Sequence, residues 1–165
     1  MTLGHTDKEN IRRVAAGFSG LEHRCQTVAE IRGVSFIDSS IDTSPERTAA
    51  TLNSLGKRVK IILGGRTKGL GNEPLYQPLM KYAEKAAIYS DAREDLEELF
   101  ETTELSKIPH AYFADFASAF DYITEGLRAG DTVLLSPAAT AYGEFRDFTE
   151  RAERFRQLID EKIRG

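Results

Sequence analysis

The sequence has 165 residues, of which 41% are hydrophobic and 29% are charged, and its formal net charge at pH 7 is −4. This length and composition are typical of one compact domain with a hydrophobic core, and not of a disordered or fibrous protein. The negative charge disfavours nonspecific nucleic-acid binding, and no apolar run approaches the roughly 20 residues of a membrane helix. The single cysteine, Cys25, excludes an internal disulfide and suits the reducing cytoplasm. We therefore expect a cytoplasmic, monomeric single domain over residues 1–165, with neither nucleic acid nor membrane as a partner.

The N-terminal part of the chain predicts a helix and then a pair of strands. A capping-box pattern followed by apolar residues at helical spacing predicts an amphipathic helix over residues 7–18. Residues 24–31 alternate between polar and apolar side chains, as half-buried strands do. The Arg32-Gly33 pair predicts a tight turn into a second strand that starts at Val34, so this end of the sheet should be antiparallel.

A polar loop and a second helix follow that strand. The loop covers residues 38–44, and Ser44 is expected to cap a helix that begins at Pro45, where a missing N–H costs nothing. Loops of this composition form turns as readily as they form binding sites. Next comes a β-branched strand over residues 59–63, which ends in a glycine-rich loop.

The rest of the chain alternates between helices and strands. The pattern predicts helices at 75–83, 93–101 and 115–129 and towards the C-terminus after Phe148, and strands at 86–89, 110–113 and 132–135. Asp91 and Asp115 are candidate helix caps. Such alternation implies right-handed crossovers and a mostly parallel sheet. The predicted fold class is therefore α/β, with a Rossmann-like, mostly parallel sheet, helices on both faces and an antiparallel strand pair near the N-terminal end.

Three polar loops follow strands of this predicted sheet, at residues 38–44, 64–69 and 136–140. Ligands bind at the carboxyl ends of parallel strands, so we expect the three loops to share one edge of the sheet. The segment GGRTKGLG lacks the spacing of a phosphate loop, and a GxGxxG fingerprint is absent. Lys68 and Thr43 remain candidates for holding a carboxylate, although an exposed lysine in a glycine turn explains the local pattern equally well.

Other reactive side chains form no recognisable site in the sequence. His23 and Arg24 are expected at the surface, where the Arg24 guanidinium can meet a phosphate or a carboxylate. The other histidines and Cys25 lack the spacing of a zinc site, and no nucleophile with a histidine base can be assigned. We therefore expect neither a metal site nor nucleophilic hydrolysis.

Four segments occur together in the order and spacing of one known family. They are FSGLEHR, DSSIDTSPERTAATL, ILGGRTKG and GDTVLLSPAATAYGEFRDFTERAERF. With them, nearly the whole chain resembles the C-terminal domain of the Mur ligases, above all of members that add D-glutamate to UDP-N-acetylmuramoyl-L-alanine. The resemblance implies a Rossmann-like domain that positions the incoming amino acid in an enzyme of peptidoglycan synthesis.

The resemblance also implies what this domain contributes and what it lacks. Such ligases carry an N-terminal UDP-binding domain and a central ATP-binding domain, and this chain resembles neither of them. In the family, ATP with Mg²⁺ converts the carboxylate of the sugar-peptide to an acyl phosphate, which the amino group of D-glutamate attacks. The C-terminal domain then supplies positioning and closure. We therefore expect no catalytic residue in this chain and no ligase activity from it alone.

Residue roles follow from the family motifs. His23 and Arg24 match the family's LEHR, whose arginine approaches the nucleotide. Asp38 and Ser39 stand where the family has the aspartate that contacts the ribose, which makes them nucleotide-binding candidates as well.

The implied amino-acid site draws on the other loops. Thr43 and Lys68 match the residues that hold the α-carboxylate of D-glutamate. Ser136, Thr140 and Phe148 lie in the stretch that receives its side-chain carboxylate.

The sequence departs from the family pattern at several of these positions. Residues 38–41 replace the usual Asn-Asp-Ser-Lys, and Asp42 is also unusual. Ala139 replaces a cysteine and Ala141 a serine, which leaves Thr140 as the nearest hydroxyl. These departures bear on the identity of the amino acid more than on the family. Two alternatives keep the fold: the equivalent domain of another Mur or folylpolyglutamate-type ligase, and a non-catalytic flavodoxin-like binding module.

Overall fold

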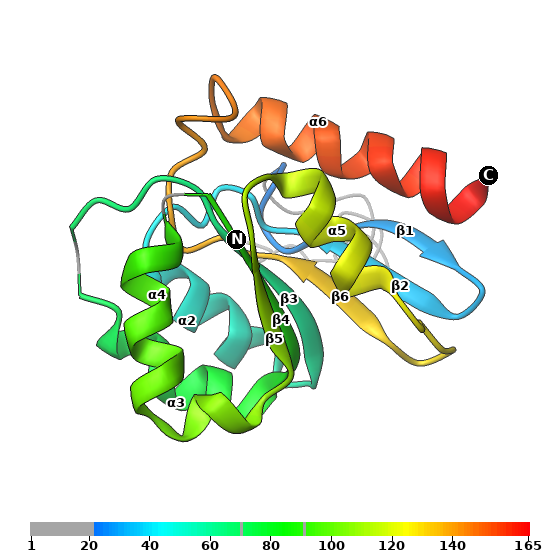
Figure 1. Cartoon of the computed structure of the whole chain (residues 1–165). Helices are drawn as coiled ribbons and strands as arrows, with labels where there is room; N and C mark the ends of the chain where they lie inside the picture. Colours follow the sequence, from blue (N-terminus) through cyan, green and yellow to red (C-terminus); the bar gives the residue numbers. More distant parts are fainter. Residues whose placement is uncertain (1–21, 70, 91) are drawn as a thin grey trace, which may run out of the picture.

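A six-stranded sheet forms the centre of the computed structural model, which describes residues 22–69, 71–90 and 92–165 (Figure 1). The strands lie in the order β1-β2-β6-β3-β4-β5, and every neighbouring pair is parallel except β1 with β2. Their bounds are β1 Gln26–Ile31, β2 Val34–Asp38, β3 Val59–Gly64, β4 Ala83–Tyr89, β5 His110–Phe113 and β6 Thr132–Leu135. The predicted fold class and the predicted antiparallel pair are both confirmed.

Helices cover both faces of this sheet (Figure 1). One hydrophobic cluster joins the sheet to α2, α3 and α4, and the other joins it to α5 and α6. The bounds are α2 Pro45–Leu55, α3 Glu73–Tyr82, α4 Ala92–Thr102, α5 Phe116–Thr124 and α6 Phe148–Ile159, with short η1 Glu104–Lys107 and η2 Asp160–Arg164. Among the described residues, no helix has both the length and the hydrophobicity needed to cross a bilayer.

The β1–β2 hairpin forms where the sequence predicts it. Its two turn residues, Arg32 and Gly33, have φ angles of 53° and 80°. Positive φ at both positions gives a turn whose twist matches that of the two strands. A side chain at Gly33 would also come within 2.9 Å of the Ala129 Cβ, so glycine is required there.

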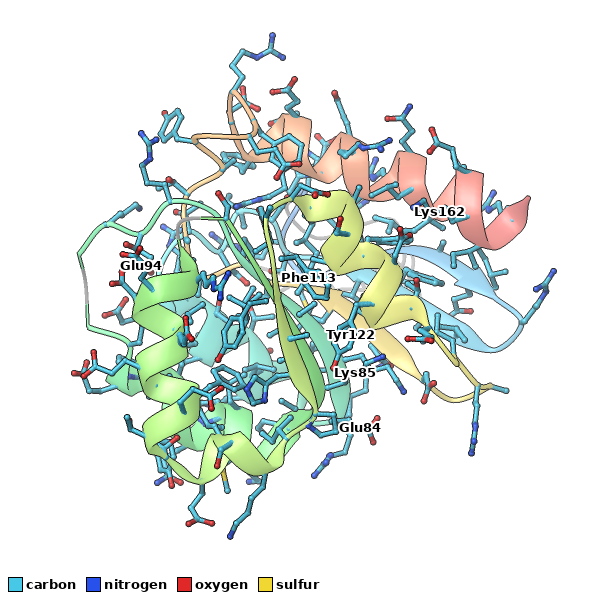
Figure 2. The ribbon with its side chains drawn as sticks, in the orientation of Figure 1. Glu84, Lys85, Glu94, Phe113, Tyr122 and Lys162 are labelled. Atoms are coloured by element: carbon cyan, nitrogen blue, oxygen red, sulfur yellow. The ribbon has the colours of Figure 1, made fainter. Side chains whose placement is uncertain are left out.

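Several predicted boundaries were wrong. Helix α5 ends at Thr124 and does not extend to Gly130, because Gly126 turns the chain with a φ of 69°. Lys85 also holds the end of the helix (Figure 2). Its ammonium donates to the Tyr122 carbonyl at 2.6 Å and lies 4.1 Å from the centroid of the Tyr122 ring. Strand β4 starts at Ala83, earlier than predicted, because it follows α3 without a loop. The predicted helix over 7–18 and the Asp91 cap lie outside the described residues.

The two other predicted helix caps differ in their chemistry. The Asp115 carboxylate accepts a hydrogen bond from the Ser118 N–H at 2.8 Å, as a capping residue should. Ser44 occupies the capping position of α2, but its side chain makes no capping hydrogen bond. The backbone hydrogen bond from Ser118, together with that from its hydroxyl, lowers the pKa of Asp115 below the ordinary aspartate value.

We expect Asp115→Ala to lower the free energy of unfolding at pH 7 by about 1 kcal/mol, and the matched Ser44→Ala to change it by less than about 0.5 kcal/mol. Because the Asp115 pKa is depressed in the folded protein, its contribution is present above the unfolded pKa of about 4 and is lost as the pH falls through the folded pKa. Urea unfolding at pH 7 and at pH 3 measures both effects. Equal losses for the two variants would contradict this account of the caps.

Candidate functional site

The three polar loops meet at one edge of the sheet, as the sequence predicts. Strands β2, β6 and β3 are neighbours, so the segments that follow them leave the sheet side by side. The Gly64 N–H donates to the Pro137 carbonyl at 2.9 Å, and the Ala138 N–H donates to the Asp42 carbonyl at 3.0 Å. Arg66 and Thr140 exchange two backbone hydrogen bonds, each of 3.0 Å. The loops therefore form one hydrogen-bonded surface.

Lys68 and Thr43 face each other across this surface. The Lys68 Nζ donates to the Thr43 Oγ1 at 3.3 Å, although the two residues come from the loops after β3 and β2. Lys68 is exposed and Thr43 is half-buried. An ammonium and a hydroxyl brought together at an open edge can both donate to one carboxylate. The juxtaposition predicted from the sequence is thus present.

A buried arginine from α6 holds the loops in place. The Arg151 side chain is fully buried, and its Nη2 donates to the Ser40 carbonyl at 2.9 Å and to the Ala139 carbonyl at 3.1 Å. Its Nη1 donates to the Gly64 carbonyl at 3.2 Å and to the Tyr89 hydroxyl at 3.3 Å. One guanidinium therefore ties together the ends of β2, β3, β4 and β6.

Gly65 makes room for this guanidinium. A Cβ at this position would lie 2.0 Å from the Thr140 carbonyl oxygen and 3.0 Å from the Arg151 Nη1, and the φ angle of Gly65 is 124°. Both the space and the backbone conformation therefore require glycine. Burial raises the pKa of the nearby Tyr89, with Arg151 opposing the shift, so the phenol stays protonated and accepts the hydrogen bond from Arg151.

Sequence reasoning missed Arg151, although a signal was present. Arg151 lies on the buried stripe of α6, at helical spacing from Phe148 and Phe155. An arginine is rarely fully buried unless its donors are satisfied. A charge on the apolar face of a helix therefore indicated an internal hydrogen-bonding role.

Asp42 forms a second buried centre below the loops. Only 4% of its surface is exposed, and its Oδ2 accepts hydrogen bonds of 2.7 Å from both Thr51 Oγ1 and Ser136 Oγ. Ser136, a predicted substrate-binding residue, is fully buried and lies 2.9 Å from the Thr48 hydroxyl as well. The Ser136 hydroxyl is therefore turned inward, towards Asp42.

Three predicted nucleotide-binding residues are also buried. His23 is only 7% exposed, contrary to the expected surface position, because its Nδ1 pairs with the Asp38 Oδ2 at 2.8 Å. Asp38 is fully buried, and its other oxygen accepts the Ser40 N–H at 2.9 Å. Ser39 is fully buried too and accepts the Cys25 N–H at 3.0 Å. Arg24, by contrast, is exposed.

The last two predicted residues lie at the surface of the same edge. Thr140 is half-buried, and its hydroxyl donates to the Arg66 carbonyl at 3.0 Å. Phe148 is half-buried at the start of α6, and its ring lies edge-on to that of His23, with centroids 5.9 Å apart. The structure thus brings the predicted residues to one end of the sheet, some facing outward and others holding the loops from within.

Comparison with known proteins identifies the family. Residues 23–139 match the family model described as "Mur ligase, glutamate ligase domain". The chain belongs to the Mur ligase family. This agrees with the resemblance of the sequence motifs and with the position of the loops that carry them.

Curated relatives are named UDP-N-acetylmuramoylalanine–D-glutamate ligase. The chain is 32% identical to the Clostridium botulinum protein over 156 residues, covering 93% of this chain and 34% of that protein. It is 35% identical to the Dechloromonas aromatica protein over 144 residues, covering 87% of this chain and 31% of that protein. The chain therefore spans about a third of the length of the relatives that it matches.

Solved structures show the same fold. A UDP-N-acetylmuramate–alanine ligase from Thermotoga maritima gives a TM-score of 0.58 at 15% identity, covering 94% of this chain and 34% of that one. A single domain of a Haemophilus ducreyi protein, described as a UDP-N-acetylmuramate:L-alanyl-γ-D-glutamyl-diaminopimelate ligase, gives a TM-score of 0.53 at 17% identity. That match covers 82% of this chain and 99% of the Haemophilus domain.

We expect Arg151→Leu to lower the free energy of unfolding by about 3 kcal/mol or more, because it leaves buried carbonyl and hydroxyl groups without a donor. The control is Arg154→Leu on the same helix, which removes a surface ion pair with Glu161 and should cost less than about 1 kcal/mol. Chemical unfolding of both variants provides the comparison. Equal stability of the two would rule out Arg151 as the organising contact.

Proposed function

We propose that this chain is the amino-acid-binding domain of a ligase that joins D-glutamate to UDP-N-acetylmuramoyl-L-alanine in peptidoglycan precursor synthesis. The observation that carries the proposal is the Lys68–Thr43 pair, at 3.3 Å, on the edge where the family motifs converge. The names of the relatives, which are D-glutamate ligases, support the choice of amino acid. The proposed setting is cytoplasmic and the proposed protein is monomeric.

In this proposal the amino acid lies across the open edge of the sheet. Lys68 and Thr43 hold its α-carboxylate, which brings a cation and a hydroxyl to one anionic group. The segment from Thr140 to Phe148 faces the side-chain carboxylate. Ser136 contributes from below, because its hydroxyl is already donated to Asp42 and so fixes the loop rather than contacting the ligand.

The nucleotide side of the site is proposed to depend on Arg24. Arg24 is the exposed member of the predicted nucleotide-binding set, whereas His23, Asp38 and Ser39 are hydrogen-bonded to one another or to the backbone. We assign these three the task of fixing the backbone from which Arg24 projects. In the whole enzyme, Mg²⁺ and ATP, held mainly by a central domain, would supply the phosphoryl group that activates the carboxylate.

The chain alone should bind but not ligate. The UDP-binding and ATP-binding domains of the proposed enzyme lie beyond this sequence, which spans about a third of its relatives. With so little of the ligand enclosed, we expect an affinity for D-glutamate around 1 mM. No ligase activity is expected, because positioning and closure need the partner domains.

Calorimetric titration with D-glutamate tests the assignment directly. We expect millimolar binding by the unmodified chain and none detectable for Lys68→Ala, while the exposed Lys81→Ala on α3 serves as the matched control. L-alanine and L-glutamate should bind more weakly than D-glutamate. Unchanged affinity in Lys68→Ala, or a preference for another amino acid, would refute the corresponding part of the proposal.

A further inference from the structure

The two hydroxyl groups predicted to meet the side-chain carboxylate are already occupied by the protein. The Ser136 hydroxyl donates to Asp42 at 2.7 Å, and the Thr140 hydroxyl donates to the Arg66 carbonyl at 3.0 Å. Ala141, the next residue of the loop, is buried and has no polar side-chain atom. An anionic group that loses water without gaining a donor binds poorly. A second carboxylate of the ligand therefore needs a donor from another segment.

Arg66 brings a guanidinium to this loop from the loop after β3. Its backbone exchanges two hydrogen bonds of 3.0 Å with that of Thr140, which fixes the two loops side by side. Its side chain is exposed and reaches Gly143, since a Cβ on Gly143 would lie 3.9 Å from the Arg66 Nη2. The guanidinium therefore lies at the open surface beside residues 141–143, which form the turn of the loop after β6.

The two carboxylates that follow this turn in the chain are held by helix N-termini. Both oxygens of Glu144 accept the Phe116 N–H at the start of α5, at 3.0 and 3.2 Å. Asp147 caps α6 and accepts the Glu150 N–H at 2.9 Å. The Arg66 guanidinium carries five N–H donors in a planar fork, so it can hold a ligand carboxylate while it also contacts the protein.

Arg66 and Lys68 lie two positions apart on one loop. The Lys68 ammonium meets Thr43 from the loop after β2, whereas the Arg66 guanidinium lies beside Gly143 from the loop after β6. Two residues of chain span at most about 7 Å, and the two carboxyl carbons of glutamate are separated by four bonds of about 1.5 Å each. One glutamate can therefore reach both cations at once.

We infer that Arg66 is a specificity-determining residue of the amino-acid site, and that its guanidinium holds the side-chain carboxylate of the incoming amino acid. The planar fork of a guanidinium matches the two oxygens of a carboxylate and does not match a neutral amide. The site therefore selects an amino acid with a second carboxylate. This inference rests on the proposed function for the position of the α-carboxylate, whereas the choice of Arg66 rests on its place beside the turn at residues 141–143.

Amide NMR titrations of the chain with D-glutamate and with D-glutamine test this inference, because a neutral amide replaces the side-chain carboxylate in D-glutamine. The unmodified chain should bind D-glutamate about tenfold more tightly, as expected for one charge-assisted interaction. Arg66→Ala should reduce this ratio to within about twofold by weakening the binding of D-glutamate alone. Arg93→Ala removes an exposed arginine that pairs with Glu97 on α4, and this control should keep the ratio. Circular dichroism verifies that each variant is folded.

Equal binding of the two ligands by the unmodified chain, or an unchanged ratio in Arg66→Ala, overturns the inference. Loss of the ratio in Arg146→Ala instead, at another exposed arginine of the loop after β6, also overturns it. Lys68→Ala tests the proposed function separately, because it should abolish the binding of both ligands. If Lys68→Ala binds normally while Arg66→Ala loses the ratio, only the assignment of the α-carboxylate fails. If the unmodified chain binds neither ligand, the proposed function and the inference fail together.

Discussion

The guanidinium of Arg151 is the contact on which the candidate site depends. The loops at the carboxyl ends of the strands are joined to one another by a few backbone hydrogen bonds, and Arg151 adds a buried link common to several of them. Arg151 donates to backbone carbonyls of three such segments and to the Tyr89 hydroxyl, from a fully buried position. Because its partners are carbonyls and a neutral phenol, the charge is spread over fixed dipoles. This arrangement explains how Lys68 and Thr43, from different loops, face each other at an open edge.

The sequence predicted the fold well because the fold depends on local patterns. The alternation of polar and apolar residues, the glycine turns and the helix caps predicted the antiparallel hairpin and most of the helices. The boundary of α5 shows where local patterns fall short: the helix ends at Thr124, where Gly126 turns the chain and Lys85 from β4 also donates to the Tyr122 carbonyl. Gly126 was a local signal that could have been used, whereas the Lys85 contact joins residues 37 positions apart and leaves none.

The sequence predicted where the candidate site lies better than it predicted which way the side chains of the site point. Topology alone put the loops of Thr43, Lys68 and Ser136 on one edge. A buried hydrogen-bond network beneath the loops decides which side chains point outward. In this network Asp42 accepts a hydrogen bond from the Ser136 hydroxyl, and Asp38 pairs with His23. Asp42 departs from the family pattern. The family motif therefore does not reveal that a buried carboxylate holds the Ser136 hydroxyl in this chain.

The central claim is that the amino acid binds at the edge held together by Arg151. The most direct measurement is an amide NMR titration of the chain with D-glutamate. The account predicts that shift changes are confined to the loops after β2, β3 and β6, around Thr43, Lys68 and Thr140. Changes centred elsewhere, or none at concentrations well above about 1 mM, the affinity expected for so open a site, would contradict it.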